Sequence, residues 1–290
     1  MKKITLSITF FIVLSASAYA ETSLWKVQNN AFTTYLGGTI HILRTSDYPL
    51  PKEFQKAYGD SDTVIFETDL EKFNSPEFQQ KLLSKVMYPG DLSLQKVLSP
   101  DVYDMLTIYC DGAGVPISSM NQFKPSIVVL TLVVLELKKI GIDQRGIDLY
   151  FHQQATADGK KTAGLETVDQ QIEYISSMGD GDENDFIVHS LKDLKKTRQI
   201  FNQLIDGWKK GNEKEMSEIL VNQIKTDYPA LYSTLIVERN HAWLPKIETY
   251  IRTPQKEFVL IGTGHLIGED GIVQDLKKRG YKVEKFHFEE

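Results

Sequence analysis

Cysteine is almost absent from this 290-residue chain, which contains only Cys110. No internal disulfide can therefore form, and packing has to stabilise the fold. The residues before Cys110 are the mostly apolar run Leu106-Thr107-Ile108-Tyr109, which is typical of a helix interior. We interpret Cys110 as a buried apolar side chain rather than a nucleophile.

Apolar runs long enough to span a bilayer, about 20 residues, are also absent. The run Ile4–Leu14 has eleven residues, follows two lysines, and ends in small residues with Ala18 and Ala20 at the positions that a signal peptidase accepts. Residues 1–20 are therefore predicted to be a cleavable secretory signal peptide, with an uncleaved anchor as the alternative. The expected location is the periplasm or outside the cell, with no stable membrane span after cleavage.

A surplus of basic residues is missing too. The chain has 33 Lys and Arg against 39 Asp and Glu, and without the two lysines of the predicted signal the charge is 31 − 39 = −8. This balance argues against a nucleic-acid partner. The remaining 290 − 20 = 270 residues contain no linker rich in Pro, Gly or Ser, so we expect a single domain over 21–290.

Strand-like patterns occur only near the two ends of the chain and around residue 163, with helical patterns between them. We expect an α/β fold with a mixed central sheet built from two terminal β-loop-α-β repeats. A large helical middle segment, about 72–255, is expected to pack on this sheet as an insertion. The predicted strands are Phe32–Gly37, Thr63–Phe66, Lys161–Leu165, Phe258–Ile261 and Tyr281–Phe288.

The helical patterns are bounded by proline starts and polar stops. Pro245 is expected to break or kink the last long helix of the middle segment, with a short continuation to Tyr250. The predicted helices are Lys52–Tyr58, Pro76–Met87, Pro100–Asp111, Pro125–Ile140, Ile147–Ala157, Val168–Met178, Asp182–Trp208, Lys214–Ile224, Pro229–Leu244 and Ile272–Lys278.

The same short signature follows the first strand of each terminal repeat. It reads Gly38-Thr39-Ile40-His41 near the amino end and Gly262-Thr263-Gly264-His265 near the carboxyl end. Parallel strands in such units cross over right-handedly, so both signatures should emerge at the carboxyl edge of one sheet, where α/β proteins bind ligands. Two neutral imidazoles at that edge suit a divalent transition metal.

Glu67 leaves the strand Thr63–Phe66 at the same edge. With His41 and His265 it forms a two-histidine, one-carboxylate set that leaves a coordination position open for water, as in hydrolytic metal sites. The alternatives are hydrogen-bonded structural histidines and a solvated Glu67, with Asp69 taking its part. The helix motif His-Glu-X-X-His is absent, so the chain is no ordinary zincin.

Other polar residues stand in suggestive contexts. Glu166 ends a strand and can face the same cleft as Glu67. Arg239 lies within an apolar helix, where arginine is unusual unless it has a carboxylate or anion partner, although His241 and a plain surface helix compete with that interpretation. Asp148 opens a helix, where a carboxylate also favours the helix dipole. Three histidines, His152, His189 and His287, are interpreted as structural or exposed.

These motifs appear in an order that resembles the TraB/GumN family, which is similar to the Tiki proteins with their paired Gly-X-X-His motifs. The resemblance covers essentially the whole mature chain. Its motifs are Gly38-Thr39-Ile40-His41, Phe66-Glu67, Gly146-Ile147-Asp148, Gly164-Leu165-Glu166-Thr167, Glu238-Arg239-Asn240 and Gly262-Thr263-Gly264-His265-Leu266. It implies a metal site of His41, His265 and Glu67, with Glu166 and Arg239 as further site residues.

The resulting hypothesis is a divalent-metal-dependent hydrolase (Mn, Co or Zn) that cleaves a peptide or protein substrate. Glu166 is expected to act as general base, and Arg239 to hold a substrate carboxylate or developing negative charge. The rival hypotheses are a non-catalytic haem- or metal-binding protein, a metal-independent esterase-like hydrolase, and a partner in envelope or polysaccharide assembly. The sequence leaves the oligomeric state open.

Overall fold

The computed structural model describes residues 22–29 and 32–288. The predicted signal peptide, residues 1–20, lies outside the described residues. Within these ranges, no helix combines the length and apolar character needed to cross a membrane.

A six-stranded mixed sheet forms the centre of the fold, with the order β6-β4-β7-β2-β1-β8. Strand β1 alone runs against the others, because it pairs antiparallel with both β2 and β8. This architecture confirms the expected α/β class with a mixed sheet and a helical middle segment. The strands are β1 Leu24–Asn29, β2 Phe32–Thr39, β4 Thr63–Thr68, β6 Lys161–Glu166, β7 Glu257–Gly262 and β8 Lys282–Lys285.

The two signature strands are direct neighbours. Strands β2 and β7 pair in parallel, with Gly38 opposite Ile261 and Thr39 opposite Gly262. The prediction that both signatures emerge at one carboxyl edge is therefore confirmed. Such strands are apolar on both faces because helices cover both sides of a parallel sheet, and β7 accordingly buries four consecutive apolar residues, Phe258 to Ile261.

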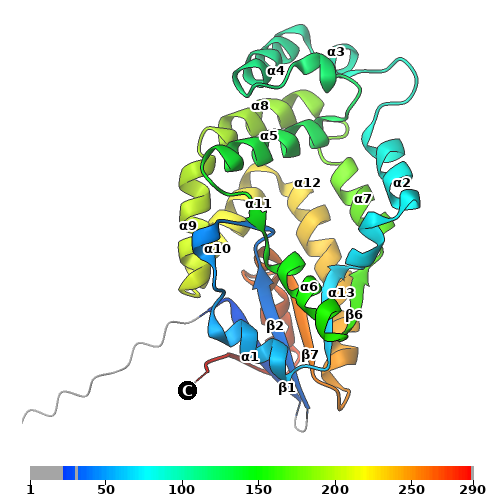
Figure 1. Ribbon diagram of the computed structural model, residues 1–290. Coiled ribbons are helices and arrows are strands. Elements are labelled where there is room, and N and C mark those ends of the chain that lie inside the picture. The colour runs from blue at the N-terminus through cyan, green and yellow to red at the C-terminus, as the bar shows by residue number, and fades with distance from the viewer. Residues whose placement is uncertain (1–21, 30–31, 289–290) are drawn as a thin grey trace, which may run out of the picture.

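Helices cover the two faces of the sheet (Figure 1). On one face, Phe54 of α1 (Lys52–Asp60) and Phe151 of α6 (Ile147–Asp158) lie 6.0 and 5.5 Å from the ring of Phe258 in β7. On β4, Phe66 meets α6 on this face, so the next residue points to the opposite face. There α13 (Glu238–Ile251) packs against β1, β2, β6 and β7.

A helical lobe with its own hydrophobic cluster lies above the carboxyl edge of the sheet in Figure 1. Its main elements are α3 (Leu94–Val97), α4 (Pro100–Gly112), α5 (Pro125–Lys139) and α8 (Glu183–Leu194). Cys110 is fully buried in this cluster, as expected. Val133 of α5 packs against both this cluster and the main core, so the lobe is in direct contact with the body of the protein.

The remaining elements connect the lobe to the sheet or follow the strands. Two of them, η4 and η5, are π-helices. All the remaining elements, in order, are β3 Ile42–Leu43, η1 Thr45–Asp47, η2 Leu70–Asn74, α2 Pro76–Val86, η3 Ile117–Ser119, β5 Gln144–Arg145, α7 Val168–Ser176, α9 Thr197–Lys209, α10 Glu213–Ser217, η4 Glu218–Asn222, α11 Gln223–Asp227, α12 Pro229–Tyr232, η5 Ser233–Val237, α14 Thr263–Leu266 and α15 Ile272–Lys278.

One helix prediction was wrong for a reason of packing. The single helix expected over Asp182–Trp208 is divided into α8 and α9, because Leu194 belongs to the core of the lobe while Trp208 belongs to the core of the sheet. Pro245 does not break its helix, and the expected short continuation to Tyr250 is confirmed, since the helix runs on to Ile251. The residues on both sides of the exposed proline, Leu244 and Ile247, are buried against the sheet and anchor the helix there.

The antiparallel edge strand β1 was not predicted. Trp25 and Leu24 in this strand are both buried, and they follow directly after the predicted cleavage site. Only pairing with β2 and β8, which are far apart in sequence, makes this short segment a strand.

The loop that carries His41 rests on the segment before α6. The amide of Ile147 donates to the carbonyl of Ile40 at 3.1 Å, and β3 pairs with β5 beside it. Gly146 comes so close that a Cβ atom there would lie 2.2 Å from the carbonyl carbon of His41. The backbone of the first signature therefore requires glycine at position 146.

We predict that Gly146→Ala lowers the free energy of unfolding by about 1–3 kcal/mol, because the added methyl group meets rigid backbone atoms. Chemical denaturation of both proteins measures this difference. Gly59→Ala is the matched control, since nothing lies within 4 Å of a Cβ at this site in helix α1. It should raise the stability by about 0.5–1 kcal/mol. Equal effects of the two substitutions would contradict the prediction.

Candidate functional site

Five predicted side chains meet at the carboxyl edge of the sheet. His41 follows β2, Glu67 lies in β4, Glu166 ends β6, and His265 lies in the short turn α14 that follows β7. Arg239 reaches them from α13 on the face opposite α6. Five parts of the chain thus supply one site, and residues up to 224 positions apart in sequence meet there, because neighbouring parallel strands end at the same edge.

Three of these side chains converge on Gly262, the last residue of β7. A Cβ atom at this glycine would lie 3.1 Å from Oε1 of Glu67, 3.6 Å from Cδ2 of His265 and 3.8 Å from Nε2 of His41. The amide of Gly262 also donates to Oε1 of Glu67 at 2.7 Å. The missing side chain of Gly262 leaves the space that these three groups share.

His41 is held by Asp148, the second residue of α6. Nδ1 of His41 lies 2.8 Å from Oδ2 of Asp148, so the imidazole donates from Nδ1, and Nε2 is the nitrogen directed to Gly262. The His41 side chain is 68% exposed, which makes it the solvent-facing member of the site. The Asp148 carboxylate raises the pKa of His41 to about 9.

Asn240 of α13 holds His265 at the Nδ1 side of its ring. Nδ1 of His265 lies 2.8 Å from Oδ1 of Asn240, and Nη1 of Arg239 donates to Nε2 at 3.1 Å. A nitrogen that accepts from a guanidinium carries no proton, so His265 is neutral with its proton on Nδ1. Burial lowers the pKa of His265 to about 3, in keeping with this state.

Arg239 is the cation at the centre of the site. Nη2 donates to Oε2 of Glu67 at 2.6 Å and to Oε1 of Glu166 at 2.9 Å, while Nε donates to Oε2 of Glu166 at 3.1 Å. Nη1 contacts His265 and also donates to the carbonyl of Leu235 at 3.3 Å. These contacts account for all five N–H groups of the guanidinium, so none is left for a substrate in this arrangement.

Two aromatic rings enclose the guanidinium. Its Cζ lies 4.5 Å from the ring centroid of Trp243 and 5.5 Å from that of Tyr174. The indole of Trp243 also donates to Oε2 of Glu166 at 3.1 Å, and its ring lies 4.5 Å from that of His265. Cation–π contact stabilises the guanidinium, and exclusion of water strengthens its attraction to the carboxylates of Glu67 and Glu166.

The two glutamates differ in their electrostatic surroundings. Burial raises the pKa of Glu67, but the positive charge of Arg239, the two histidines and the amide of Gly262 outweigh burial and lower it to about 2. For Glu166, burial is the larger influence, and the pKa is raised despite the paired Arg239. Glu67 is therefore the more firmly ionised of the two carboxylates.

The structure brings together the five residues that the sequence singles out and leaves the alternatives outside. Asp69, the alternative to Glu67, accepts from the amide of Glu71 at the start of η2. His241 is exposed on α13.

Sequence reasoning missed the supporting roles of three residues. Asp148 has the appearance of a helix-dipole residue, and Asn240 and Trp243 have that of ordinary helix positions. The available clue was their place within or beside the short motifs Gly146-Ile147-Asp148 and Glu238-Arg239-Asn240.

The donor chemistry of His41, Glu67 and His265 fits a transition metal. Each imidazole gives its Nδ1 proton to an oxygen acceptor and directs Nε2 inward, as metal-ligating histidines do. Among the residues that the structure describes, however, no three His, Cys, Asp or Glu side chains lie close enough together to hold a metal ion. In addition, Nη1 of Arg239 occupies the single lone pair of His265 Nε2. A metal ion bound by His265 would require that hydrogen bond to break.

Sequence comparison identifies two kinds of relative. TIKI1 of Xenopus tropicalis, named a metalloprotease, is 24% identical over 313 aligned residues, which cover 90% of this chain and 60% of that protein. TIKI1 of Homo sapiens, also named a metalloprotease, is 23% identical over 90% of this chain and 61% of its own length. YbaP of Escherichia coli, an uncharacterised protein, is 23% identical over 84% of this chain and 87% of its own.

These relatives support a family rather than an activity. The chain spans about 60% of the length of the two TIKI1 proteins. No solved structure matches the chain at a significant level. A model of the TraB/PrgY/gumN family, in contrast, matches residues 23–285, which is nearly the whole chain. This protein therefore belongs to the TraB/PrgY/gumN family.

Proposed function

We propose that this protein is an exported hydrolase that cleaves peptide or related amide bonds with the help of a divalent metal ion, Mn, Co or Zn. The single observation that supports the proposal most is the convergence of His41, Glu67 and His265 on the open space at Gly262. The metalloprotease names of the TIKI1 relatives agree with it. Export rests on the predicted signal peptide, residues 1–20.

The charges of the site favour a divalent ion. A metal ion on Nε2 of His41 would displace the proton that this imidazole otherwise carries, so both imidazoles of the metal-bound site are neutral. The carboxylates of Glu67, Glu166 and Asp148 then carry three negative charges against one positive charge on Arg239. The balance of −3 + 1 = −2 is what one divalent cation neutralises. Glu67, Glu166 and Arg239 are buried, and uncompensated buried charge is costly.

In this proposal, His41, Glu67 and His265 hold the metal, which acidifies a water molecule and polarises the scissile carbonyl when bound. Asp148 and Asn240 keep the two imidazoles oriented through their Nδ1 protons. His41 is the exposed member, so substrate and water reach the site from its side.

Arg239 and Glu166 take part as a pair. The base role expected for Glu166 and the anion-binding role expected for Arg239 both require this pair to open, because each is held by the other through two hydrogen bonds. While it is closed, the pair fixes the orientation of Glu67 through Nη2 of Arg239. We therefore assign positioning of Glu67 to the closed pair, and base and anion-binding roles to the open one.

The first prediction concerns the metal itself. The purified mature protein should contain a stoichiometric amount of Mn, Co or Zn, and the double variant His41→Ala, His265→Ala should contain almost none, because two of three ligands are gone. Elemental analysis measures the metal content, with hydrolysis of a peptide library as a second readout. His241→Ala, an exposed histidine on α13, is the control and should keep its metal. Equal metal content in the double variant, or hydrolysis that resists chelators, would contradict the proposal.

The second prediction concerns the residue that orients His41. Asp148→Asn should weaken metal binding by about 10–100-fold, since the amide cannot supply the negative charge that holds the Nδ1 proton. Metal titration followed by calorimetry measures the change. The control, Asp143→Asn, makes the same chemical change five residues earlier at an exposed position, and should have no effect. An unchanged metal affinity in Asp148→Asn would show that Asp148 serves only the helix.

The third prediction concerns the space at Gly262. Its φ of −49° and ψ of 133° accept an alanine, so Gly262→Ala should fold normally. The methyl group would stand 3.1 Å from Oε1 of Glu67, closer than an ordinary contact, and should weaken metal binding by about tenfold or more. Gly264→Ala in the same loop is the matched control, because its methyl group would make only ordinary contacts at 3.6 Å or more. The same metal affinity in both variants would be evidence against a metal at Gly262.

A further inference from the structure

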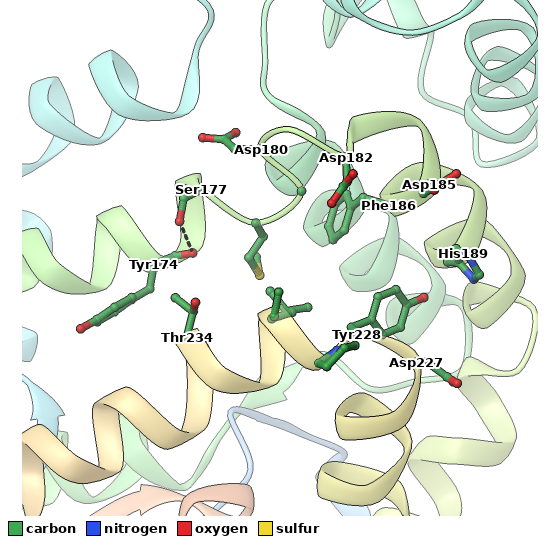
Figure 2. Close-up of a pocket in the computed structure, with 15 residues that line it drawn as sticks. Tyr174, Ser177, Asp180, Asp182, Asp185, Phe186, His189, Asp227, Tyr228 and Thr234 are labelled. Atoms are coloured by element: carbon green, nitrogen blue, oxygen red, sulfur yellow. Dashed lines mark hydrogen bonds between the residues drawn. The ribbon is translucent and has the colours of Figure 1, made fainter.

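A cavity of about 480 Å³ lies between the loop that joins α7 to α8 and the helical segment α12–η5. Figure 2 shows its lining residues, with Asp180 and Asp182 on the loop, Thr234 on the facing helix, and Tyr228 just before that helix begins. Its volume is within the range of ligand-binding pockets in proteins. None of the five residues of the candidate site lines this cavity.

The cavity adjoins the Arg239 network. Tyr174 lines the cavity, and its ring lies 5.5 Å from Cζ of Arg239. On the facing helix, Leu231 and Thr234 line the cavity within one turn of Leu235, whose carbonyl accepts from Arg239. Tyr174 is thus the residue that the cavity and the surroundings of Arg239 have in common.

The inner walls of the cavity are apolar. Phe186, Tyr228 and Leu231 form part of them and also line a second cavity of about 320 Å³. This second cavity extends between α5, α8 and α9 and is lined mainly by aliphatic and aromatic side chains. The two cavities share three lining residues, so the first cavity lies beside a largely apolar one.

The rim of the cavity is acidic. Asp180, Asp182, Asp185 and Asp227 line it, and no lysine or arginine does. Asp180 pairs with Lys124 at 3.0 Å, whereas within residues 22–29 and 32–288 no ion pair is formed by the other three. Three uncompensated carboxylates around an apolar opening attract a cation that carries apolar groups.

From this combination we infer that the cavity binds the substrate of the site through a lysine or arginine side chain that stands next to a large apolar residue. The basic group lies among the three aspartates, and its apolar neighbour lies against Phe186 and Leu231. The inference rests on the proposed function, since it takes the occupant to be a peptide that extends to the adjoining Arg239 network. The inference assigns to the cavity a preference for basic peptide segments, which the metal site alone does not provide.

The test measures binding without cleavage. Two fluorescently labelled peptides of ten residues with blocked ends, one with a central Lys-Phe pair and one with Glu-Phe, are titrated with His41→Ala protein. The Lys-Phe peptide should bind more tightly, and less so as salt is added. The triple substitution Asp182→Asn, Asp185→Asn, Asp227→Asn should weaken binding of the Lys-Phe peptide by about tenfold or more and leave that of the Glu-Phe peptide unweakened.

The matched control removes three exposed carboxylates from helix α4, through Asp101→Asn, Asp104→Asn and Asp111→Asn. It makes the same change in net charge at residues that do not line the cavity and should leave both affinities as they were. Equal binding of the two peptides, no binding of either, or equal losses in the two triple variants would overturn the inference. Metal content decides the proposed function separately, because this assay uses a protein that does not need to be active.

Discussion

The pairing of Arg239 with Glu67 and Glu166 is the interaction on which the site depends. All three side chains are at least nine-tenths buried, so each charge has lost most of its hydration and must be compensated by its partners. The five N–H groups of the guanidinium achieve this, and they reach His265 as well. Removing any one member would leave an unpaired buried charge, which commonly costs 3–5 kcal/mol. The site is therefore rigid where it is buried and open only at His41.

This network also gives the protein two cation positions that overlap. The guanidinium takes up the lone pair of His265 Nε2 and one oxygen of Glu67, both of which belong to the proposed metal ligands. Occupation by a metal and full hydrogen bonding of Arg239 thus exclude each other at His265. The proposed chemistry and the proposed opening of the Arg239–Glu166 pair are for this reason parts of one rearrangement. Tyr174 lines the acidic cavity and also lies beside the same guanidinium, so it connects the proposed peptide-binding cavity to the part of the site that rearranges.

The family supports this picture in its outline. The match of the family model to residues 23–285 places the chain in the TraB/PrgY/gumN family, whereas the TIKI1 metalloproteases and YbaP are only 23–24% identical to it. Activity, in contrast, depends on site geometry, which diverges faster than a fold does. Here the orientation of both imidazoles by Asp148 and Asn240 is a stronger argument for metal chemistry than any overall similarity.

The sequence alone determined the mixed α/β class, the duplicated signature and the five side chains that meet at the sheet edge, because strand patterns and short motifs are local. It could not predict β1 or the division of Asp182–Trp208 into two helices, since packing between distant segments decides both. The tertiary structure alone decided that Asp148 holds His41 and that Arg239 uses every N–H group internally. Hydrogen bonds between residues 107 and 172 positions apart depend on distance and direction in space, which no local pattern encodes.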